Sequence, residues 1–217
     1  MSSLVELFLK ETLNSLIMTF AASAVAFVFG GALGLVMVLT KRGGLRENPI
    51  LYKILDWLIN LFRSIPFVIL MLLLLPFTRM LVSTTIGVKG TIPPLAIAAI
   101  PFVARLVENT LNEVDKNLIE MAKSLGASHW QILSEVIIPE AMPLLVQQGT
   151  MAIVTILSYG AMAGFTGGGG LGVVAINYGY NRNNMEMLAI ASALLVILVQ
   201  IIEVIGKRTS KKIDKRK

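Results

Sequence analysis

Residues 12–40 read TLNSLIMTFAASAVAFVFGGALGLVMVLT, an uninterrupted stretch without a charged side chain. A helix of about 20 apolar residues spans the hydrocarbon core of a bilayer, so this stretch is long enough to cross it. Its apolar residues are continuous, whereas a strand of a membrane barrel alternates apolar with polar residues. The stretch also lacks the charged leading segment and small-residue cleavage site of a signal peptide. We therefore predict a transmembrane helix that is retained in the mature protein.

Four further apolar segments follow, at about residues 51–80, 92–111, 143–165 and 187–206. The 217-residue chain is 55% hydrophobic and 15% charged, with a mean hydropathy of +0.77; about 25% charged residues is usual in soluble domains. This composition excludes a soluble monomer and a disordered chain, and the absence of cysteine excludes a disulfide-stapled secreted domain. We predict an all-α integral membrane protein in which residues 1–217 form a single transmembrane domain of five helices.

The second segment is unusual because Arg63 lies well inside it. A charge at the bilayer centre is costly, so Arg63 is either a boundary anchor or a charge on an ion pathway. In the anchor interpretation, residues 49–60 form an interfacial lead-in and residues 64–78 lie at membrane depth. Arg63 and Arg79 would then mark the two boundaries, roughly 24 Å apart along a helix, with both side chains reaching outward. We favour the anchor.

Basic residues are distributed unevenly around the five segments. Fourteen lie on the side that carries the loop 41–53, the connection 105–142 and the tail, and four lie on the other side. The tail holds seven of them: Lys207, Arg208, Lys211, Lys212, Lys215, Arg216 and Lys217. Because cytoplasmic loops are enriched in Lys and Arg, we expect the N-terminus outside and the C-terminus in the cytoplasm. Basic residues that flank apolar runs indicate topology, and no nucleic-acid partner is expected.

Glycines recur at four-residue spacing in two of the segments. Gly30 and Gly34 form one such pair, and Gly160, Gly164 and Gly168 continue the spacing near the fourth segment. Small residues at this spacing allow helix backbones to approach closely in lipid. The pattern leaves open whether they pack within one subunit, form a dimer face or line a pore.

Side chains for catalysis or metal binding are scarce. His129 is the only histidine, and there is neither cysteine nor a GxSxG serine motif. Glycines within residues 167–172 fit GxGxxG, but they follow a membrane helix instead of a strand, so we interpret them as a flexible turn with close helix crossing. Glu108 and Glu203 lie near predicted cytoplasmic ends, which leaves no intramembrane carboxylate for ion coupling. We expect no catalytic residue, no metal and no cofactor in this chain, and hence no energy source of its own.

The connection at about residues 112–142 carries start and stop signals for two short helices, which predict a cytoplasmic helical hairpin between the third and fourth spans. Asn117 with Glu120 three residues later is typical of a helix start. Gly126 is placed to end that helix in a left-handed conformation, which glycine adopts readily. The helix carries one apolar stripe, made of Leu118, Ile119, Ala122 and Leu125.

A second short helix is predicted to follow in the same hairpin. Ser128 with Gln131 forms a capping-type start, and Pro139 is expected to end the helix. One face of it is apolar, with Trp130, Leu133, Val136 and Ile137. Such stripes can rest on the protein's own bundle, or they can fill a groove on a partner. The residues alone favour the two interpretations equally.

The same hairpin resembles the EAA motif of ABC importer permeases, which reads EAA, three residues, G, nine residues, then I-x-L-P. Here Glu120-Met121-Ala122 is followed by Gly126 and by Val136-Ile137-Ile138-Pro139. Met121, Val136 and Ile138 replace the motif's alanine, isoleucine and leucine, and these changes stay apolar. The resemblance implies a coupling contact with a separate ATPase through Glu120, Ala122, Gly126, Ala127, Val136, Ile138 and Pro139.

Further segments are similar to the methionine branch of this family, over residues 11–206. They are FRSIPF at 62–67, PFTR at 76–79, PFVAR at 101–105, VEN at 107–109, SYGAM at 158–162 and GGLG at 169–172. The resemblance implies a homodimer in the bacterial cytoplasmic membrane that imports methionine, with the D form as a second substrate. It further implies two copies of a cytoplasmic ATPase, which binds ATP and magnesium, and an extracytoplasmic methionine-binding protein or lipoprotein.

Two side chains near the end of the fourth span, Tyr159 and Met162, are our candidates for the translocation path. The nearest alternative is the same class of permease with another amino acid as cargo. A stand-alone channel or an ion-coupled carrier is a different class, and dependence on an ATPase distinguishes it. An intramembrane enzyme is excluded by the absence of paired acids, histidines and a nucleophile motif.

Overall fold

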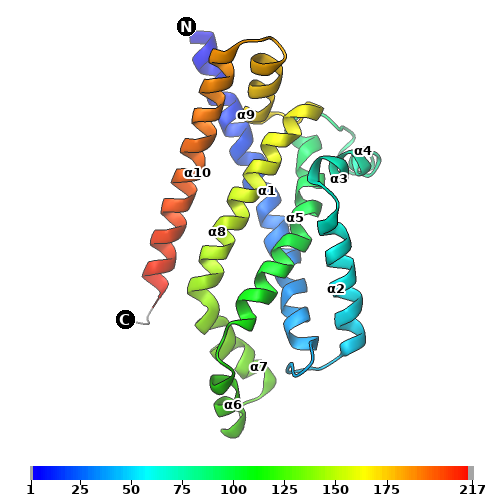
Figure 1. Ribbon diagram of the computed structural model, residues 1–217, viewed down its shortest axis with the longest axis vertical. Helices are drawn as coiled ribbons and strands as arrows, with labels where there is room; N and C mark the ends of the chain where they lie inside the picture. Colours follow the sequence, from blue (N-terminus) through cyan, green and yellow to red (C-terminus); the bar gives the residue numbers. More distant parts are fainter. Residues whose placement is uncertain (1, 215–217) are drawn as a thin grey trace.

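Long helices running side by side make up the computed structural model, which describes residues 2–214 and the side-chain surroundings from residue 4 (Figure 1). The two termini lie at opposite ends of the bundle. The C-terminal end also carries the helical hairpin, and we call it the hairpin end. The predicted tail charges Lys215, Arg216 and Lys217, like Met1, lie outside the described residues.

Four helices in the described part of the chain are each long and apolar enough to cross a membrane. They are α1 (Ser2–Thr40), α5 (Gly87–Asn112), α8 (Ile138–Met162) and α10 (Met185–Ile213). A fifth span is available if the bent pair α2 (Pro49–Ser64) and α3 (Phe67–Leu73) counts as one. The predicted all-α membrane fold is thereby confirmed.

Shorter helices connect the long ones. They are α4 (Leu75–Val82), α6 (Lys116–Ser124), α7 (His129–Gln131), a π-helical turn η1 (Ile132–Ile137), a 3-10 turn η2 (Ala163–Thr166), α9 (Gly170–Val173) and a second π-helical segment η3 (Val174–Tyr180).

The second segment differs from the sequence prediction. Helix α2 runs alongside α5 instead of forming an interfacial lead-in over residues 49–60, and α3 turns away from it by 101° (Figure 1). The break is at Ile65, which is extended with φ −85° and ψ 122°. A residue before proline is disfavoured in the helical region, and Pro66 has no N–H for a helical hydrogen bond. The expectation of one straight membrane stretch over residues 64–78 is therefore wrong.

The first glycine pair brings α1 against α5, which form the most extensive helix pair of the bundle. A β-carbon at Gly30 would lie 2.6 Å from the carbonyl oxygen of Ile100, and one at Gly34 would lie 2.6 Å from that of Ala104. Such distances leave no room for a side chain. Of the roles left open by the sequence, this pair therefore serves packing within one subunit.

The glycine-rich turn at residues 167–172 is held by hydrogen bonds to distant parts of the chain. Its carbonyl oxygens accept from the N–H of Gly87 and the hydroxyl of Thr91, both at 2.9 Å. Its N–H groups donate to the carboxylate of Glu11 at 2.7 Å and the hydroxyl of Ser15 at 2.8 Å. The turn thus joins α8 and α9 to the starts of α1 and α5, at the end opposite the hairpin.

Candidate functional site

The hairpin begins with α6, whose first turn is capped by Asp115. The carboxylate of Asp115 accepts a hydrogen bond from the N–H of Asn117 at 2.9 Å. An aspartate directly before the first turn satisfies an N–H that has no partner within the helix. The prediction that Asn117 starts the helix is therefore wrong by two residues, because Asn117 already lies inside the first turn.

Gly126 ends α6 in the predicted left-handed conformation, with φ +81°. Its N–H donates to the carbonyl of Lys123 at 3.0 Å, and the N–H of Ala127 donates to the carbonyl of Ala122 at 3.1 Å. This pair of bonds is the Schellman arrangement, in which the residue after the cap almost always needs a positive φ. The reversal of the chain between the two hairpin helices therefore depends on this glycine.

The second hairpin helix starts at the predicted capping box. The N–H of Gln131 donates to the Ser128 hydroxyl at 3.3 Å, and the side-chain carbonyl of Gln131 accepts from the N–H of Ser128 at 2.9 Å. Pro139 does not end this helix, contrary to the prediction. The chain passes through η1, where the N–H of Ile138 bonds the carbonyl of Leu133, and it continues into α8. The wider π-helical turn accommodates a proline that a regular helix does not.

One face of the hairpin is anchored on the bundle. Its buried side chains include Ile132, Leu133 and Ile137, and they pack with Leu111 and Val114 at the end of α5. Ile119, Ala122, Ala127 and Ile138 pack against the same cluster. Because the inner face is apolar and filled, the hairpin is held in a fixed orientation at this end of the bundle.

The other face of the hairpin is exposed and partly apolar. The exposed fractions are 57% for Met121, 82% for Leu125 and 73% for Trp130. The apolar stripe predicted for α6 is therefore divided, with Ile119 and Ala122 turned inward and Leu125 turned outward. Three large exposed side chains in one short segment indicate an interaction surface.

The predicted coupling residues lie on both faces. Glu120, Gly126 and Pro139 are exposed, whereas the others are partly buried: Ala122, Ala127, Val136 and Ile138. The structure adds the three exposed apolar side chains to this surface. The motif does not select them, because Leu125 and Trp130 occupy its variable positions and Met121 stands in place of its alanine.

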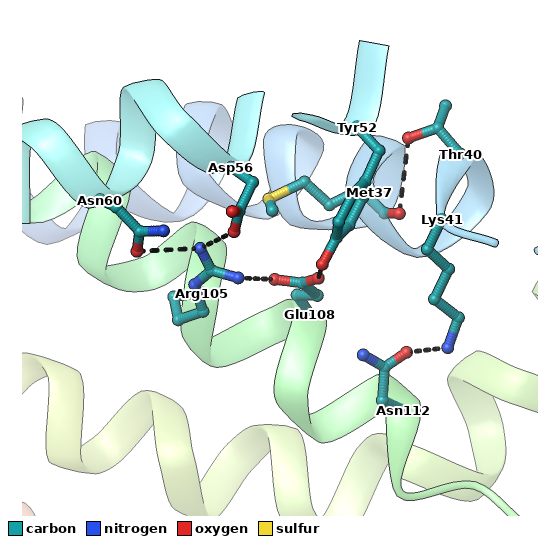
Figure 2. A network of polar contacts seen from close by, with 9 residues as sticks. All are labelled: Met37, Thr40, Lys41, Tyr52, Asp56, Asn60, Arg105, Glu108 and Asn112. Atoms are coloured by element: carbon teal, nitrogen blue, oxygen red, sulfur yellow. Dashed lines mark hydrogen bonds and ion pairs between the residues drawn. The ribbon is translucent and has the colours of Figure 1, made fainter. Parts of the chain in front are cut away.

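A polar network joins α2 to α5 beside the hairpin end (Figure 2). The Arg105 guanidinium pairs with Glu108 at 2.6 Å and with Asp56 at 2.5 Å, and it donates to the Asn60 side chain at 3.2 Å. The Tyr52 hydroxyl donates to the second carboxylate oxygen of Glu108 at 2.8 Å. Glu108 is only 2% exposed, so its charge depends on these partners.

This network was not predicted from the sequence, in which Glu108 was expected only near the cytoplasmic end of a helix. The sequence offered only one signal for this network, the spacing of polar residues along two helices. Arg105 and Glu108 are three residues apart on one helix, while Tyr52, Asp56 and Asn60 recur every four residues on another. Residues at these spacings share a face of a helix, but which helices pair is a property of the folded bundle.

Lys41 lies just beyond α1, between this network and the hairpin. Its ammonium group donates to the side-chain oxygen of Asn112, at the end of α5 (Figure 2). Partial burial lowers the pKa of Lys41 below its ordinary value; the Glu108 carboxylate opposes this shift, and the positive charge of Lys116 adds to it. Positive charge therefore gathers where α6 begins.

The two candidates for the translocation path lie at the far end of α8. The Tyr159 ring stacks on Phe67 of α3, with ring centres 4.7 Å apart and planes at 3°. The Met162 side chain, one turn further, is exposed. Within residues 2–214, no group of three or more His, Cys, Asp or Glu side chains could hold a metal ion.

Comparison with known proteins gives a consistent result. Residues 30–215 match the family described as binding-protein-dependent transport system inner membrane component. The chain is 44% identical over 211 residues to the probable D-methionine transport system permease protein MetI of Vibrio cholerae serotype O1, covering 97% of this chain and 94% of the relative. It is 43% identical over 181 residues to the methionine import system permease protein MetP of Bacillus subtilis, covering 83% and 82%.

A solved structure extends this likeness to the fold. The inward-facing MetNI methionine ABC transporter contains a chain that superimposes with a TM-score of 0.96 at 38% identity, covering 99% of this chain and all of that one. The superposition includes the hairpin end as well as the long helices.

Proposed function

The chain belongs to the family of binding-protein-dependent transport system inner membrane components, and we propose that it forms the membrane path of an ATP-driven importer for methionine, in the L form and also the D form. The observation that carries the proposal is the hairpin, which is anchored on one face and exposes large apolar side chains on the other. The names of relatives that cover nearly the whole chain support methionine as the cargo.

The hairpin end is the cytoplasmic end in this proposal, and the N-terminus lies outside. The excess of basic residues in the loop 41–53, the hairpin and the tail supports this orientation. The loop, the hairpin and the part of the tail up to Asp214 all lie at the same end of the bundle (Figure 1).

Two copies of the chain and two copies of a cytoplasmic ATPase make up the proposed importer, with an extracytoplasmic binding protein that delivers methionine. ATP and magnesium bind to the ATPase, and this chain carries no cofactor. The MetNI transporter that the fold matches is an ABC transporter, which supports an ATPase partner here.

Coupling to the ATPase is assigned to the exposed face of the hairpin. Met121, Leu125 and Trp130 provide the apolar contact with a groove on the partner, and Glu120 and Pro139 lie beside them. The inward residues Ala122, Ala127, Val136 and Ile138 hold that face in position. A movement of the ATPase groove is then transmitted through η1 directly into α8, because the second hairpin helix, made of α7 and η1, continues into α8 without a break.

The translocation path is assigned to the far end of α8. The exposed Met162 provides a soft, flexible contact for a thioether cargo, and Tyr159 is held by its stacking on Phe67. Both side chains come from the helix that the hairpin moves.

Uptake of labelled methionine tests the proposed function. We would use a host strain without other methionine importers and compare the intact strain, a deletion of this gene, a deletion of the ATPase gene, and each deletion restored. Uptake at sub-micromolar methionine is expected to be lost in both deletions and to return on restoration. Unchanged uptake without this gene would assign another amino acid as cargo, and uptake that persists without the ATPase would indicate a channel or an ion-coupled carrier.

Gly126→Val tests the coupling role of the hairpin. A residue other than glycine in the left-handed region is strained by about 1–2 kcal/mol, and a β-branched one is a clear outlier, so the turn is expected to change shape. We expect methionine uptake to fall about fivefold or more at an unchanged amount of protein in the membrane. The same variant should also retain less ATPase when the complex is purified.

The matched control is Gly87→Val. Gly87 has φ +74° and, like Gly126, open space where a side chain would go, but it starts α5 at the opposite end of the bundle. It carries the same backbone strain away from the hairpin and should keep the ATPase bound. Wild-type uptake by Gly126→Val would contradict the coupling role, and equal loss of ATPase from both variants would assign the effect to strain alone.

A further inference from the structure

A half-enclosed pocket of about 240 Å³ lies behind the hairpin, between α6 and the loop that joins α1 to α2. Its floor is apolar, with Val38, Leu111 and Ile137. Its rim is cationic, with Lys41, Arg42, Lys116 and Lys123. The pocket is thus suited to a ligand that is anionic at one end and apolar at the other.

The positive charge of the rim is poorly neutralised by the protein. Glu120 is the one acidic residue among the pocket's lining. Within the described residues, the side chains of Arg42, Lys116 and Lys123 take part in none of the salt bridges. The ammonium group of Lys41 donates to a neutral amide, that of Asn112. Two further carboxylates act on the lining, that of Glu47 on the N–H of Gly43 at 3.2 Å and that of Glu108 on Lys41. Four basic side chains still outnumber the nearby acidic ones, and this excess favours an anion between them.

The position of the pocket along the bundle indicates where that anion comes from. Its walls are the first residues after two membrane helices: Lys41 to Leu45 follow α1, and Val114 and Lys116 follow α5. Helix ends of this kind lie at the level of the lipid headgroups. The exposed apolar side chains assigned to the ATPase, Met121 and Leu125, are not part of the lining, and Glu120 is the one coupling residue that lies at its edge.

We propose that this pocket binds the phosphate headgroup of an anionic phospholipid from the cytoplasmic leaflet, with the phosphate on the basic rim and the glycerol end of the acyl chains on the apolar floor. The orientation of the pocket toward that leaflet rests on the proposed function. A lipid bound there contacts the inner side of α6 and the loop after α1 together. It therefore holds the hairpin against the bundle, and the coupling surface depends on the lipid composition of the membrane.

Lipid titration of the purified permease–ATPase complex tests the proposal. After delipidation in detergent, phosphatidylglycerol and phosphatidylcholine with the same acyl chains would be added, and bound lipid counted by native mass spectrometry. We expect phosphatidylglycerol to bind with at least about tenfold higher affinity, because each basic residue near an anionic lipid contributes several-fold. The triple variant Arg42→Gln, Lys116→Gln, Lys123→Gln should lose that preference.

The control removes the same number of charges elsewhere at the same end of the bundle, in Arg208→Gln, Lys211→Gln, Lys212→Gln on α10. It should keep the preference. If both triple variants lost the preference for phosphatidylglycerol equally, or if the wild type showed no such preference, the proposed lipid site would be overturned. Displacement of the lipid by an equal concentration of inorganic phosphate or glycerol phosphate would overturn the lipid source and assign a free phosphate.

Orientation is measured separately, so that its failure is recognised. The chain has no cysteine, so Asn117→Cys creates a unique labelling site at the exposed start of α6. A membrane-impermeant thiol reagent should label it in inside-out vesicles and not in intact cells. Labelling in intact cells would overturn the proposed orientation, and with it the assignment to the cytoplasmic leaflet, even if phosphatidylglycerol binds.

Discussion

Arg105→Leu is expected to destabilise the folded protein by about 3–5 kcal/mol. The substitution leaves Glu108, which is 2% exposed, without its ion-pair partner, and an uncompensated buried charge is among the most destabilising changes known in proteins. The remaining partner of that carboxylate is the Tyr52 hydroxyl, which donates one neutral hydrogen bond. The midpoint of thermal unfolding of the purified protein measures the effect.

The partner substitution should be milder, and this asymmetry is the sharper test. Glu108→Leu removes one partner of Arg105 but leaves Asp56, at 2.5 Å from the guanidinium. The double variant Arg105→Leu, Glu108→Leu removes both buried charges and should recover part of the lost stability, since apolar replacements of a whole ion pair are often tolerated. Equal effects of the two single variants, or additive effects in the double, would contradict the description of Glu108 as a buried, dependent charge.

The network has a consequence for the hairpin. It fixes α2 to α5 only one turn before α5 ends at Asn112, and α6 begins at Lys116. The orientation of the hairpin is thus set from two sides, by the apolar cluster beneath it and by the helix that leads into it. A loosened α5 is expected to reduce the amount of ATPase bound as well as the stability.

The long helices could be predicted from the sequence because composition alone decides them. A run such as residues 12–40 has no stable alternative to a membrane helix, since its backbone must be bonded internally in lipid. The turn at Gly126 and the helix cap at Ser128 could also be predicted, because both depend on hydrogen bonds to neighbours within five residues.

The failures occurred where one local signal competes with distant packing. Proline predicts a break, and it breaks the chain at Pro66, yet at Pro139 the π-helical turn of η1 absorbs it and the helix continues. The same residue type thus has opposite outcomes, and the cluster around Ile132 and Ile137 favours the continuous helix. The network around Arg105 could not be predicted from the sequence, because it forms only when α2 packs against α5.

Gly172→Ala is the second large effect that we expect. A β-carbon at this position would lie 2.1 Å from the carbonyl oxygen of Ala161 and 2.7 Å from its carbonyl carbon. Because these are backbone atoms of a long helix, no side-chain rotation relieves the overlap, and α9 must separate from α8. Overpacking of a core costs about 1–3 kcal/mol when side chains can adjust, so we expect a loss at or above the top of that range. The yield and the unfolding midpoint of the purified protein measure it.

Gly149→Ala is the matched control, because Gly149 lies within α8 and a β-carbon there meets only the Phe27 ring at an ordinary 3.7 Å. Alanine is favoured over glycine inside a helix by about 0.5–1 kcal/mol, so this variant should be as stable as the wild type or slightly more stable. Opposite signs for the two alanine variants would show that the contact between α8 and α9 requires glycine. A wild-type midpoint for Gly172→Ala would mean that the two helices are not in backbone contact, and the glycine-rich turn would then lose its role in holding the far end of α8.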